Sequence, residues 1–309
     1  MRLESAKKTF LDEKIPIEQA DVVIVPFGLE KSVCFGKGTA KGPQRIIQVS
    51  PQLEVFDEEL EKDVYKEVKI STLEEPEIQK SHEAAIGQLE EIVDEIYKLN
   101  KFPLILGGEH SLTLGPVRSA QKKYGEISIL QFDAHADLRE EYEGTIYNHA
   151  SVMRRCLNLD NVNLTQIGIR NISTDTNEFG YLKENKKRIR TFWAKDMARW
   201  RIVDILKSLK DNVYLSFDVD AFDSSLMPSC GTPEPGGLGW NQTMDILKEV
   251  AAKKKIIGAD VVELAPIQGF TAPDFVAAKL VYKIIGYTFA LKNSLLFKKV
   301  ISLEQTKKL

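Results

Sequence analysis

The sequence predicts an α/β protein built on a doubly wound parallel sheet. Short, almost continuous runs of apolar and β-branched residues alternate with longer segments in which apolar residues recur at helical spacing. Apolar runs of this kind are typical of strands that are covered by helices on both faces. Strands that alternate with helices along a chain indicate βαβ units, and these form parallel sheets.

Seven segments carry the strand pattern. They are Asp21–Phe27, Val68–Ser71, Pro103–Leu106, Ile127–Phe132, Leu164–Ile169, Val213–Phe217 and Ile256–Glu263. Helices are predicted between and after them, where apolar residues recur every three or four positions. These are Ile78–Leu99, Met197–Leu209, Gln242–Ala252 and Asp274–Leu291. Pro273 precedes the last helix, and Asn241 is the expected N-cap of the helix before it.

Length and composition fit one domain that covers residues 1–309. This length would allow about two domains, but no linker, repeat or low-complexity segment marks a boundary. Lys and Arg total 42 against 45 Asp and Glu, and this near balance gives no reason to expect nucleic acid or a membrane surface as partner. With no signal-peptide pattern and no apolar run of membrane-spanning length, we expect a cytoplasmic protein.

The cysteine pattern argues against two small-domain architectures. Cys34, Cys156 and Cys230 are few, odd in number and widely separated. A disulfide framework or a zinc ribbon needs closely spaced cysteines in larger numbers. We therefore expect neither.

Acidic and histidine residues gather at or shortly after the ends of four of the predicted strands. Ligands of open parallel sheets bind beyond the carboxyl ends of the strands, so these side chains are expected at one rim. In chain order they are His110, then Asp133, His135 and Asp137, then Asp218 and Asp220, and finally Glu263.

The spacing of the aspartates predicts a metal site. Residues two positions apart in extended chain project to one face, which brings Asp133, His135 and Asp137 together and likewise Asp218 and Asp220. Four neighbouring carboxylates repel one another unless they are protonated or bind cations, and two divalent ions would balance them. Carboxylate and imidazole ligands without thiolate suit Mn²⁺, Fe²⁺, Ni²⁺ or Zn²⁺, and oxygen-rich sites favour Mn²⁺. Two ions about 3.5–4 Å apart can share a hydroxide nucleophile, so the predicted reaction class is hydrolysis.

Each motif taken singly has an ordinary structural explanation. Asp133–Asp137 could decorate a surface loop, and a pair such as Asp218 and Asp220 is often a cap or a turn. The sequence GGEHS around His110 could be a turn with a satisfied histidine. The coincidence of all three at strand ends, in a chain with only four histidines, favours the metal site.

These motifs resemble those of the ureohydrolase (arginase/agmatinase) family. GGEHS, FDAHADLR, SFDVDAFD and VELAP occur in the family's order between about Phe27 and Pro266. The resemblance implies a three-layer α/β/α sandwich with a mainly parallel eight-stranded sheet. It also implies an enzyme that hydrolyses a guanidinium group to urea and an amine with two Mn²⁺ ions per subunit, in a homo-oligomer (trimer or hexamer).

By position, the resemblance divides six side chains between the two ions. One ion would be held by His110, Asp133, Asp137 and Asp218. The other would be held by Asp133, His135, Asp218 and Asp220. Asp133 and Asp218 would then bridge the ions.

Four further residues are candidates for catalysis or substrate binding. His149 matches the family's proton-shuttling histidine, and a histidine outside the ligand set suits an acid for the leaving amine. Glu263 matches the carboxylate that receives the substrate guanidinium, whose planar shape suits a bidentate carboxylate. Thr232 lies in a loop that the family places near the site, and Glu143 belongs to an acidic loop before His149.

The acidic loop, residues 139–148, bears on the choice of substrate. It holds three glutamates and one arginine, which suits a tail ending in ammonium, as in agmatine, and suits a carboxylate tail poorly. The stretches EEYEG and HASVMRR resemble the agmatinase branch of the family. The expected reaction is therefore conversion of agmatine, a small cationic guanidine, to putrescine and urea, a step of polyamine biosynthesis.

Several alternatives to this reaction remain open. The glutamates of the loop could simply face solvent. The enzyme could instead be an arginase, a guanidinobutyrase or an aminopropylagmatine ureohydrolase. A non-catalytic metal-binding homologue is a further alternative, although such proteins normally lose a ligand and all six ligand positions are filled here.

Overall fold

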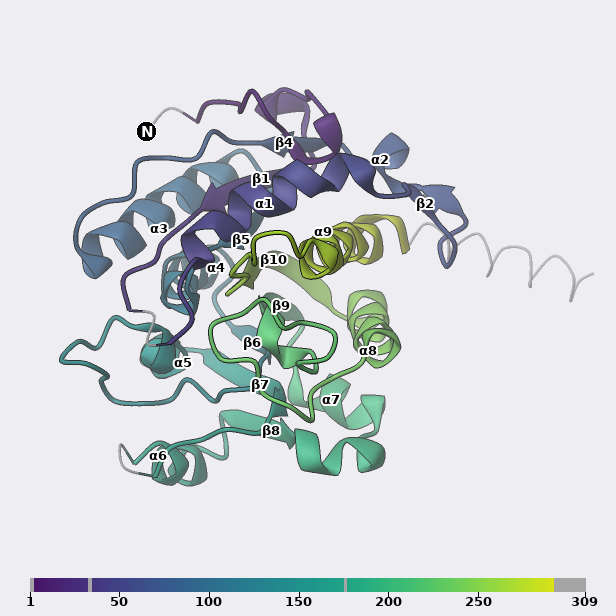
Figure 1. Cartoon of the computed structure of the whole chain (residues 1–309). Coiled ribbons are helices and arrows are strands. Elements are labelled where there is room, and N and C mark those ends of the chain that lie inside the picture. Colours follow the sequence, from purple (N-terminus) through teal and green to yellow (C-terminus); the bar gives the residue numbers. More distant parts are fainter. Residues whose placement is uncertain (1–2, 33–34, 175–176, 292–309) are drawn as a thin grey trace, which may run out of the picture.

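A sheet of eight parallel strands forms the centre of the molecule. The computed structural model describes residues 3–32, 35–174 and 177–291. The strands of this sheet are β1 (Val22–Phe27), β4 (Ile70–Thr72), β5 (Phe102–Gly107), β6 (Ile127–Phe132), β7 (Val162–Ile169), β8 (Ile189–Trp193), β9 (Asn212–Asp218) and β10 (Lys255–Val262). Their order is β4-β1-β5-β10-β9-β6-β7-β8, and every neighbouring pair is parallel. The sheet runs from β4 at the top of Figure 1 to β8 at the bottom.

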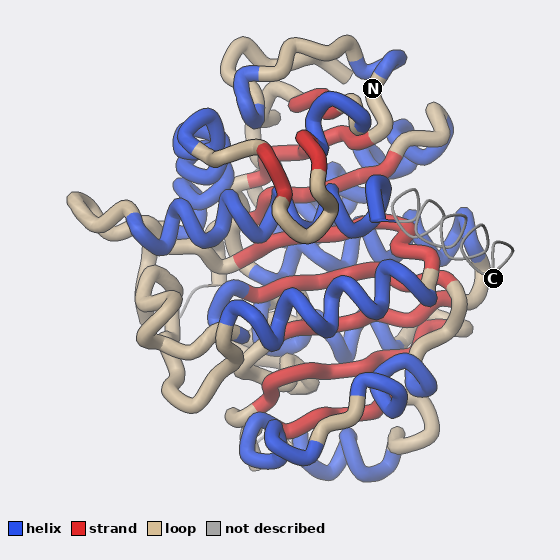
Figure 2. The backbone as a smooth tube through the Cα atoms, turned by 90° about the vertical axis from the view of Figure 1, so that its right-hand side faces the viewer, coloured by secondary structure: helices blue, strands red, loops and turns tan. Residues whose placement is uncertain are grey.

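Helices cover both faces of this sheet, as Figure 2 shows. The α-helices of the described residues are α1 (Gly42–Val49), α2 (Val64–Glu67), α3 (His82–Lys98), α4 (Leu114–Tyr124), α5 (Val152–Leu157), α6 (Glu178–Glu184), α7 (Ile202–Ser208), α8 (Trp240–Lys253) and α9 (Ala272–Ile285). A small antiparallel pair, β2 (Phe56–Asp57) and β3 (Lys62–Asp63), lies outside the main sheet.

Two apolar cores hold these helices against the sheet. Alternate residues of a strand point to opposite faces, and β1 divides accordingly between the two cores. Val22 and Ile24 pack in the core that also contains apolar residues of α1, α7, α8 and α9. Val23 and Val25 pack in the core that contains apolar residues of α3, α4 and α5. The predicted three-layer α/β/α architecture is therefore confirmed.

The topology brings the polar strand ends together. Strands β5, β10, β9 and β6 are consecutive in the sheet, although they are far apart in the sequence. The register pairs Phe132 with Phe217 and Val262 with Asp218, so the strands end at nearly the same level. The acidic residues that follow them share one rim as a result.

The edge strand β8 is not among the seven strands that the sequence predicts. Only Ile189 and Phe192 of its residues are buried, and it lies at the end of the sheet. A strand that is open to solvent lacks the continuous apolar run that reveals a central strand.

Several expected helix starts are wrong. The segment from Met197 is interrupted at Trp200, and α7 begins only at Ile202. Helix α8 begins at Trp240 with Gly239 at its N-cap, so Asn241 lies inside the helix. Pro273 is the second residue of α9, inside its first turn rather than before it.

The structure describes two of the three cysteines. Cys156 and Cys230 are both buried and free, whereas Cys34 lies outside the described residues. Among the helices that are described, none is long and apolar enough to cross a bilayer.

Gly108 provides a test of how tightly the rim is packed. A Cβ atom at this position would lie 2.0 Å from the backbone oxygen of Leu29, so Gly108→Ala must push two loops apart. We expect it to lower the free energy of unfolding by about 1–3 kcal/mol. Gly87→Ala is the matched control, because a Cβ there meets nothing within 4 Å inside α3. We expect it to stabilise the protein by about 0.5–1 kcal/mol. Urea unfolding of the variants measures both changes, and equal stabilities would contradict this account.

Candidate metal centre

The six predicted ligands converge at the carboxyl ends of three central strands. His110 begins the short helical turn that closely follows β5, and Asp133 directly follows β6. Asp218 is the last residue of β9, and Asp220 lies in the turn after it. Five of the six side chains are buried, while His135 keeps 29% of its side chain exposed. The strand order brings these side chains together, as the sequence indicates. Extended period-two geometry is not the cause for Asp137, whose backbone is left-handed, or for Asp220, which lies in a helical turn.

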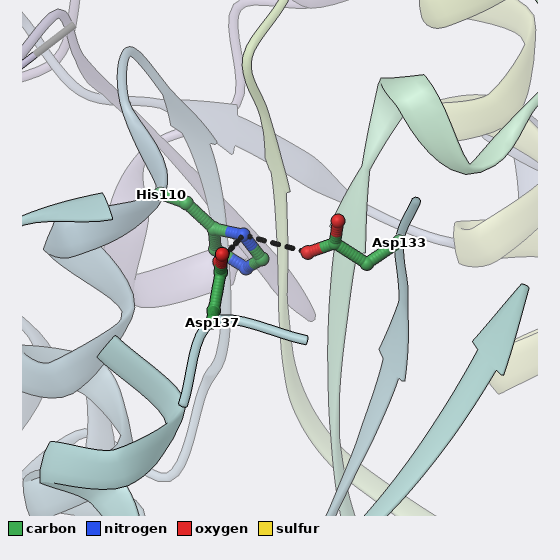
Figure 3. A group of neighbouring side chains, drawn as sticks. All are labelled: His110, Asp133 and Asp137. Atoms are coloured by element: carbon green, nitrogen blue, oxygen red, sulfur yellow. Dashed lines mark ion pairs between the residues drawn. The ribbon is translucent and has the colours of Figure 1, made fainter. Parts of the chain in front are cut away.

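The first group of ligands surrounds one nitrogen of His110 (Figure 3). His110 Nδ1 lies 3.1 Å from Asp133 Oδ2 and 3.0 Å from Asp137 Oδ2. Asp218 Oδ2 lies 3.5 Å from the same nitrogen. One imidazole nitrogen thus faces three carboxylates.

The second group shares a carboxylate with the first. His135 Nδ1 lies 2.9 Å from Asp220 Oδ2 and 3.7 Å from Asp133 Oδ1. The two oxygens of Asp133 therefore face different histidines. Two clusters of three potential metal ligands result, and Asp133 belongs to both. Among the ion pairs of the described residues, Asp218 lies near His110 of the first group but not near His135 of the second.

Two acids near the rim have left-handed backbones, which non-glycine residues seldom adopt. Asp137 has a φ of 53° and Glu263 a φ of 66°. The Asp137 carbonyl accepts hydrogen bonds from the backbone N–H groups of Met153 and Arg154. The Glu263 N–H donates to the carbonyl of Gly108. These bonds hold both acids in conformations that cost free energy, as is common at functional sites.

A buried hydrogen-bond chain defines the proton positions of His110. Ser216 Oγ lies 2.8 Å from His110 Nε2 and donates its hydrogen to Asp260 Oδ1, also at 2.8 Å. Because a hydroxyl has one hydrogen, Ser216 accepts from Nε2–H, and a neutral His110 carries its lone pair on Nδ1. Nδ1 is buried and has no hydrogen-bond partner among the residues that the structure describes. It thus presents a lone pair to carboxylate oxygens, an arrangement that a cation would stabilise.

Electrostatics in the cluster lead to the same conclusion. Burial and the nearby charges of Asp220 and Asp133 raise the pKa of Asp218 well above its ordinary value. Burial and the Asp133 charge likewise raise the pKa of Asp137 to about 7. Burial opposes protonation of His135, but Asp220 and Asp133 outweigh it and raise its pKa to about 12. Without a cation, these groups must share protons to remain together.

The pKa values of His110 and Asp133 also depend on one another. Burial opposes the charged form of His110, yet the three carboxylates around it raise its pKa well above the ordinary value. Burial likewise opposes the ionised form of Asp133, but the close approach of His110 and His135 outweighs it and lowers its pKa. A divalent ion would take the place of the proton that this pairing otherwise needs.

A cavity of about 400 Å³ opens above the two groups. Its lining includes metal-ligand candidates from both groups together with three of the other predicted residues, His149, Thr232 and Glu263. The Glu263 carboxylate is buried and accepts the backbone N–H of His110 at 2.6 Å. Burial raises its pKa to about 8. Burial lowers the pKa of His149.

The structure does not bring Glu143 to this cavity. Its backbone and that of Gly144 are left-handed, with φ of 51° and 78°, and Tyr142 and Thr145 pair across them. This tight turn leaves Glu143 exposed and outside the lining of the cavity. Its predicted contact with substrate therefore gains no support.

The other acids of residues 139–148 also face solvent. Glu140 and Glu141 are exposed, and Glu140 pairs with Arg154. The cavity instead receives Arg139 and Tyr142 from this loop, with the guanidinium of Arg139 4.7 Å from the centre of the Tyr142 ring.

Two lining acids had no signal in the sequence patterns. Glu178 begins α6 and accepts the backbone N–H groups of Leu138 and Ser173. Glu234 lies in the loop that also carries Thr232. Neither follows a strand, so the strand-end pattern does not indicate either acid, although the family resemblance places the loop of Glu234 near the site.

Comparison with known proteins identifies the family. The family model described as "Arginase family" matches residues 20–286. The chain belongs to the arginase family. The family, its fold and its class of enzyme, hydrolases of guanidino C–N bonds, are thereby confirmed for this chain.

Individual members of the arginase family align over nearly the whole length. The chain is 37% identical to the N(1)-aminopropylagmatine ureohydrolase of Synechocystis sp., over 93% of this chain and 95% of the relative. It is 33% identical to the agmatinase of Pyrococcus horikoshii, over 88% and 93% of the two chains. The structure of the agmatine ureohydrolase of Thermoplasma volcanium superposes with a TM-score of 0.83 and 27% identity, covering 93% of this chain and 96% of that one.

The shared position of Asp133 leads to a prediction about metal content. Asp133→Ala removes an oxygen ligand from both groups, so we expect it to lose both divalent ions. Asp137→Ala removes a ligand from the first group only, so we expect one ion to remain. Elemental analysis after dialysis against Mn²⁺ measures the ratio of ion to chain.

Asp245→Ala is the control for this experiment. Asp245 is exposed on α8, away from both groups, and this variant should keep the full metal content. Retention of both ions by Asp133→Ala would refute the shared role of this residue.

Proposed function

We propose that this chain is a binuclear manganese ureohydrolase that converts agmatine to putrescine and urea. The observation that carries the proposal is the position of Asp133, whose two oxygens face His110 and His135 respectively. One ion would be held by His110, Asp133, Asp137 and Asp218. The other would be held by Asp133, His135, Asp218 and Asp220. When bound, the two ions supply Lewis-acid chemistry that activates water for hydrolysis at neutral pH.

Glu263 is proposed to orient the guanidinium group. Its carboxylate lies in the cavity beside His110 and is almost fully buried. Burial favours the neutral form of this acid, so a guanidinium that pairs with it would stabilise the charged form. A planar guanidinium can donate two parallel hydrogen bonds to a carboxylate, which fixes the direction of the scissile C–N bond.

His149 is proposed to donate the proton to the leaving amine. It lines the same cavity but lies outside both groups of ligand candidates. An amine leaves readily only when its nitrogen is protonated, and a positioned imidazole is suited to this transfer.

Charges around the cavity favour a cationic substrate. Besides the metal-ligand candidates, the lining includes the carboxylates of Glu178, Glu234 and Glu263 and one guanidinium, that of Arg139. The excess of negative charge supports a tail that ends in ammonium. We further propose, from the family resemblance, a cytoplasmic homo-oligomer (trimer or hexamer).

N(1)-aminopropylagmatine is the second candidate substrate, and a specific observation favours it. Relatives with that name in Synechocystis sp. and Thermus thermophilus are each 37% identical to this chain, whereas the agmatinases of Pyrococcus horikoshii and Bacillus subtilis are 33% and 30% identical. This substrate carries one more ammonium group than agmatine, and the partly exposed Glu234 of the cavity lining offers a second acid for it.

A panel of guanidines tests the substrate. We expect Mn²⁺-loaded protein to release urea from agmatine and N(1)-aminopropylagmatine with kcat/KM at least about tenfold above that for arginine or 4-guanidinobutyrate. The ratio between the two cationic guanidines decides between the two candidates. Asp133→Ala serves as the inactive control. Faster hydrolysis of either carboxylate-bearing guanidine would contradict the proposal.

The role of His149 is tested separately from metal binding. His149→Asn removes the titratable ring but no ligand candidate, so the metal content should stay at the wild-type value. We expect kcat to fall by about 10²–10⁴-fold, the usual worth of a positioned acid or base. Steady-state kinetics with the best substrate of the panel measures this. An unchanged kcat would remove His149 from the mechanism.

A further inference from the structure

His149 is held at the cavity by a residue from a distant part of the chain. Ser32 lies in the loop after β1, 117 positions before His149. Its hydroxyl oxygen lies 3.1 Å from His149 Nδ1 and accepts the backbone N–H of His149 at 3.2 Å. The ring of Tyr142 meets the imidazole edge-on, with 5.7 Å between ring centres.

A buried carboxylate orients the Ser32 hydroxyl. Glu109 is fully buried and accepts the hydroxyl hydrogen of Ser32 at 2.9 Å. The same carboxylate accepts the backbone N–H groups of Lys31 and Ser32, at 2.5 and 2.6 Å, and the hydroxyl of Ser111 at 2.5 Å. Two N–H and two O–H groups thus donate to Glu109, so its carboxylate is the acceptor in all four hydrogen bonds. His82 Nε2 lies 3.8 Å away on α3.

The count of hydrogens then assigns the tautomer of His149. A serine hydroxyl has one hydrogen and two lone pairs. Ser32 donates its hydrogen to Glu109 and accepts the His149 backbone N–H with one lone pair. Only a lone pair remains to meet the imidazole, so His149 Nδ1 must carry a hydrogen. In the neutral ring, Nε2 is then the nitrogen without one.

We propose that Ser32, oriented by Glu109, is a positioning residue that fixes His149 in the Nδ1–H tautomer. This rests on the proposed function, in which His149 protonates the leaving amine. Nε2 takes up a proton from solvent and gives it to the amine nitrogen as the C–N bond breaks and the N–H bond forms. The hydrogen on Nδ1 stays with Ser32 throughout, so the ring returns to the same neutral tautomer after each turnover.

Substitution of Ser32 tests this role by kinetics. Ser32→Ala should lower kcat by about tenfold or more, because misplaced acids and wrong tautomers are costly in catalysis. KM should change by no more than about twofold and the metal content should not change. Ser32→Thr restores a hydroxyl and should recover most of the lost kcat. An unchanged kcat in Ser32→Ala would overturn the proposal, and so would a loss expressed only in KM.

Ser111→Ala is the matched control. Ser111 donates a hydroxyl hydrogen to the same Glu109 oxygen as Ser32, and it is not a hydrogen-bond partner of His149 in the contacts described. Its loss of kcat should be clearly smaller than that of Ser32→Ala. An equal loss would mean that both serines act by anchoring Glu109, which would overturn the specific role of Ser32.

A double mutant separates this proposal from the proposed function. In the His149→Asn background, Ser32→Ala should change kcat by no more than about twofold, because residues that act as a unit are not additive. A further full loss would show that Ser32 acts elsewhere. Failure of the proposed function has a different signature, since His149→Asn alone would then keep the wild-type kcat.

The tautomer itself can be observed without measuring activity. The chain has only four histidines, so ¹⁵N-histidine labelling gives few signals, and His149 is assigned by its disappearance in His149→Asn. Solid-state NMR of protein loaded with a diamagnetic divalent ion, at a pH where the ring is neutral, should show a hydrogen on Nδ1 and none on Nε2. Ser32→Ala should abolish this preference. A bare Nδ1 in the wild-type protein would overturn the proposal.

Discussion

The site depends on one electrostatic constraint, the close approach of four buried aspartates at a single rim. Asp133 stands at the centre of this cluster, because its two oxygens face different histidines. Mutual repulsion would drive such carboxylates apart, or raise their pKa values until they bind protons, unless positive charge lies between them. Burial raises the cost further, since solvent cannot screen the charges. The order of the central strands therefore holds these acids at one level of the rim.

Strained backbones and close packing also hold the rim in place. Asp137 and Glu263 adopt left-handed backbones. Hydrogen bonds to α5 hold the first conformation, and a hydrogen bond to Gly108 holds the second. Gly108 allows the loop after β5 to pass against the backbone of Leu29, where a side chain would clash. The geometry of the rim is thus over-determined by close packing, which is how sites retain strained conformations.

The same kind of hydrogen-bond chain, from acid to serine to histidine, orients two histidines that have different proposed roles. A buried acid fixes the hydrogen of a serine hydroxyl, and the serine then determines which ring nitrogen carries a hydrogen. Asp260 and Ser216 act in this way on His110, leaving Nδ1 as a potential ligand atom. Glu109 and Ser32 have the same relation to His149. The proposed metal binding and the proposed proton transfer would thus rest on equivalent hydrogen-bond chains within one rim.

The sequence predicts those features that depend on local periodicity. The spacing of Asp133, His135 and Asp137 at a strand end predicts that they lie together. The left-handed backbone of Asp137 departs from the extended geometry behind that prediction. The edge strand β8 escaped detection because its partly exposed residues break the apolar run. Glu143 lies in an acidic loop, but a left-handed turn directs the glutamate away from the cavity. Ser32 could not be found, because its partners lie 77 and 117 positions away and no local pattern links them.

Anomalous diffraction from crystals grown with Mn²⁺ tests the central claim most directly. The account predicts two anomalous peaks about 3.5–4 Å apart, one on each side of Asp133, with His110 at the first and His135 at the second. A single peak, or two peaks that do not share Asp133, would contradict it.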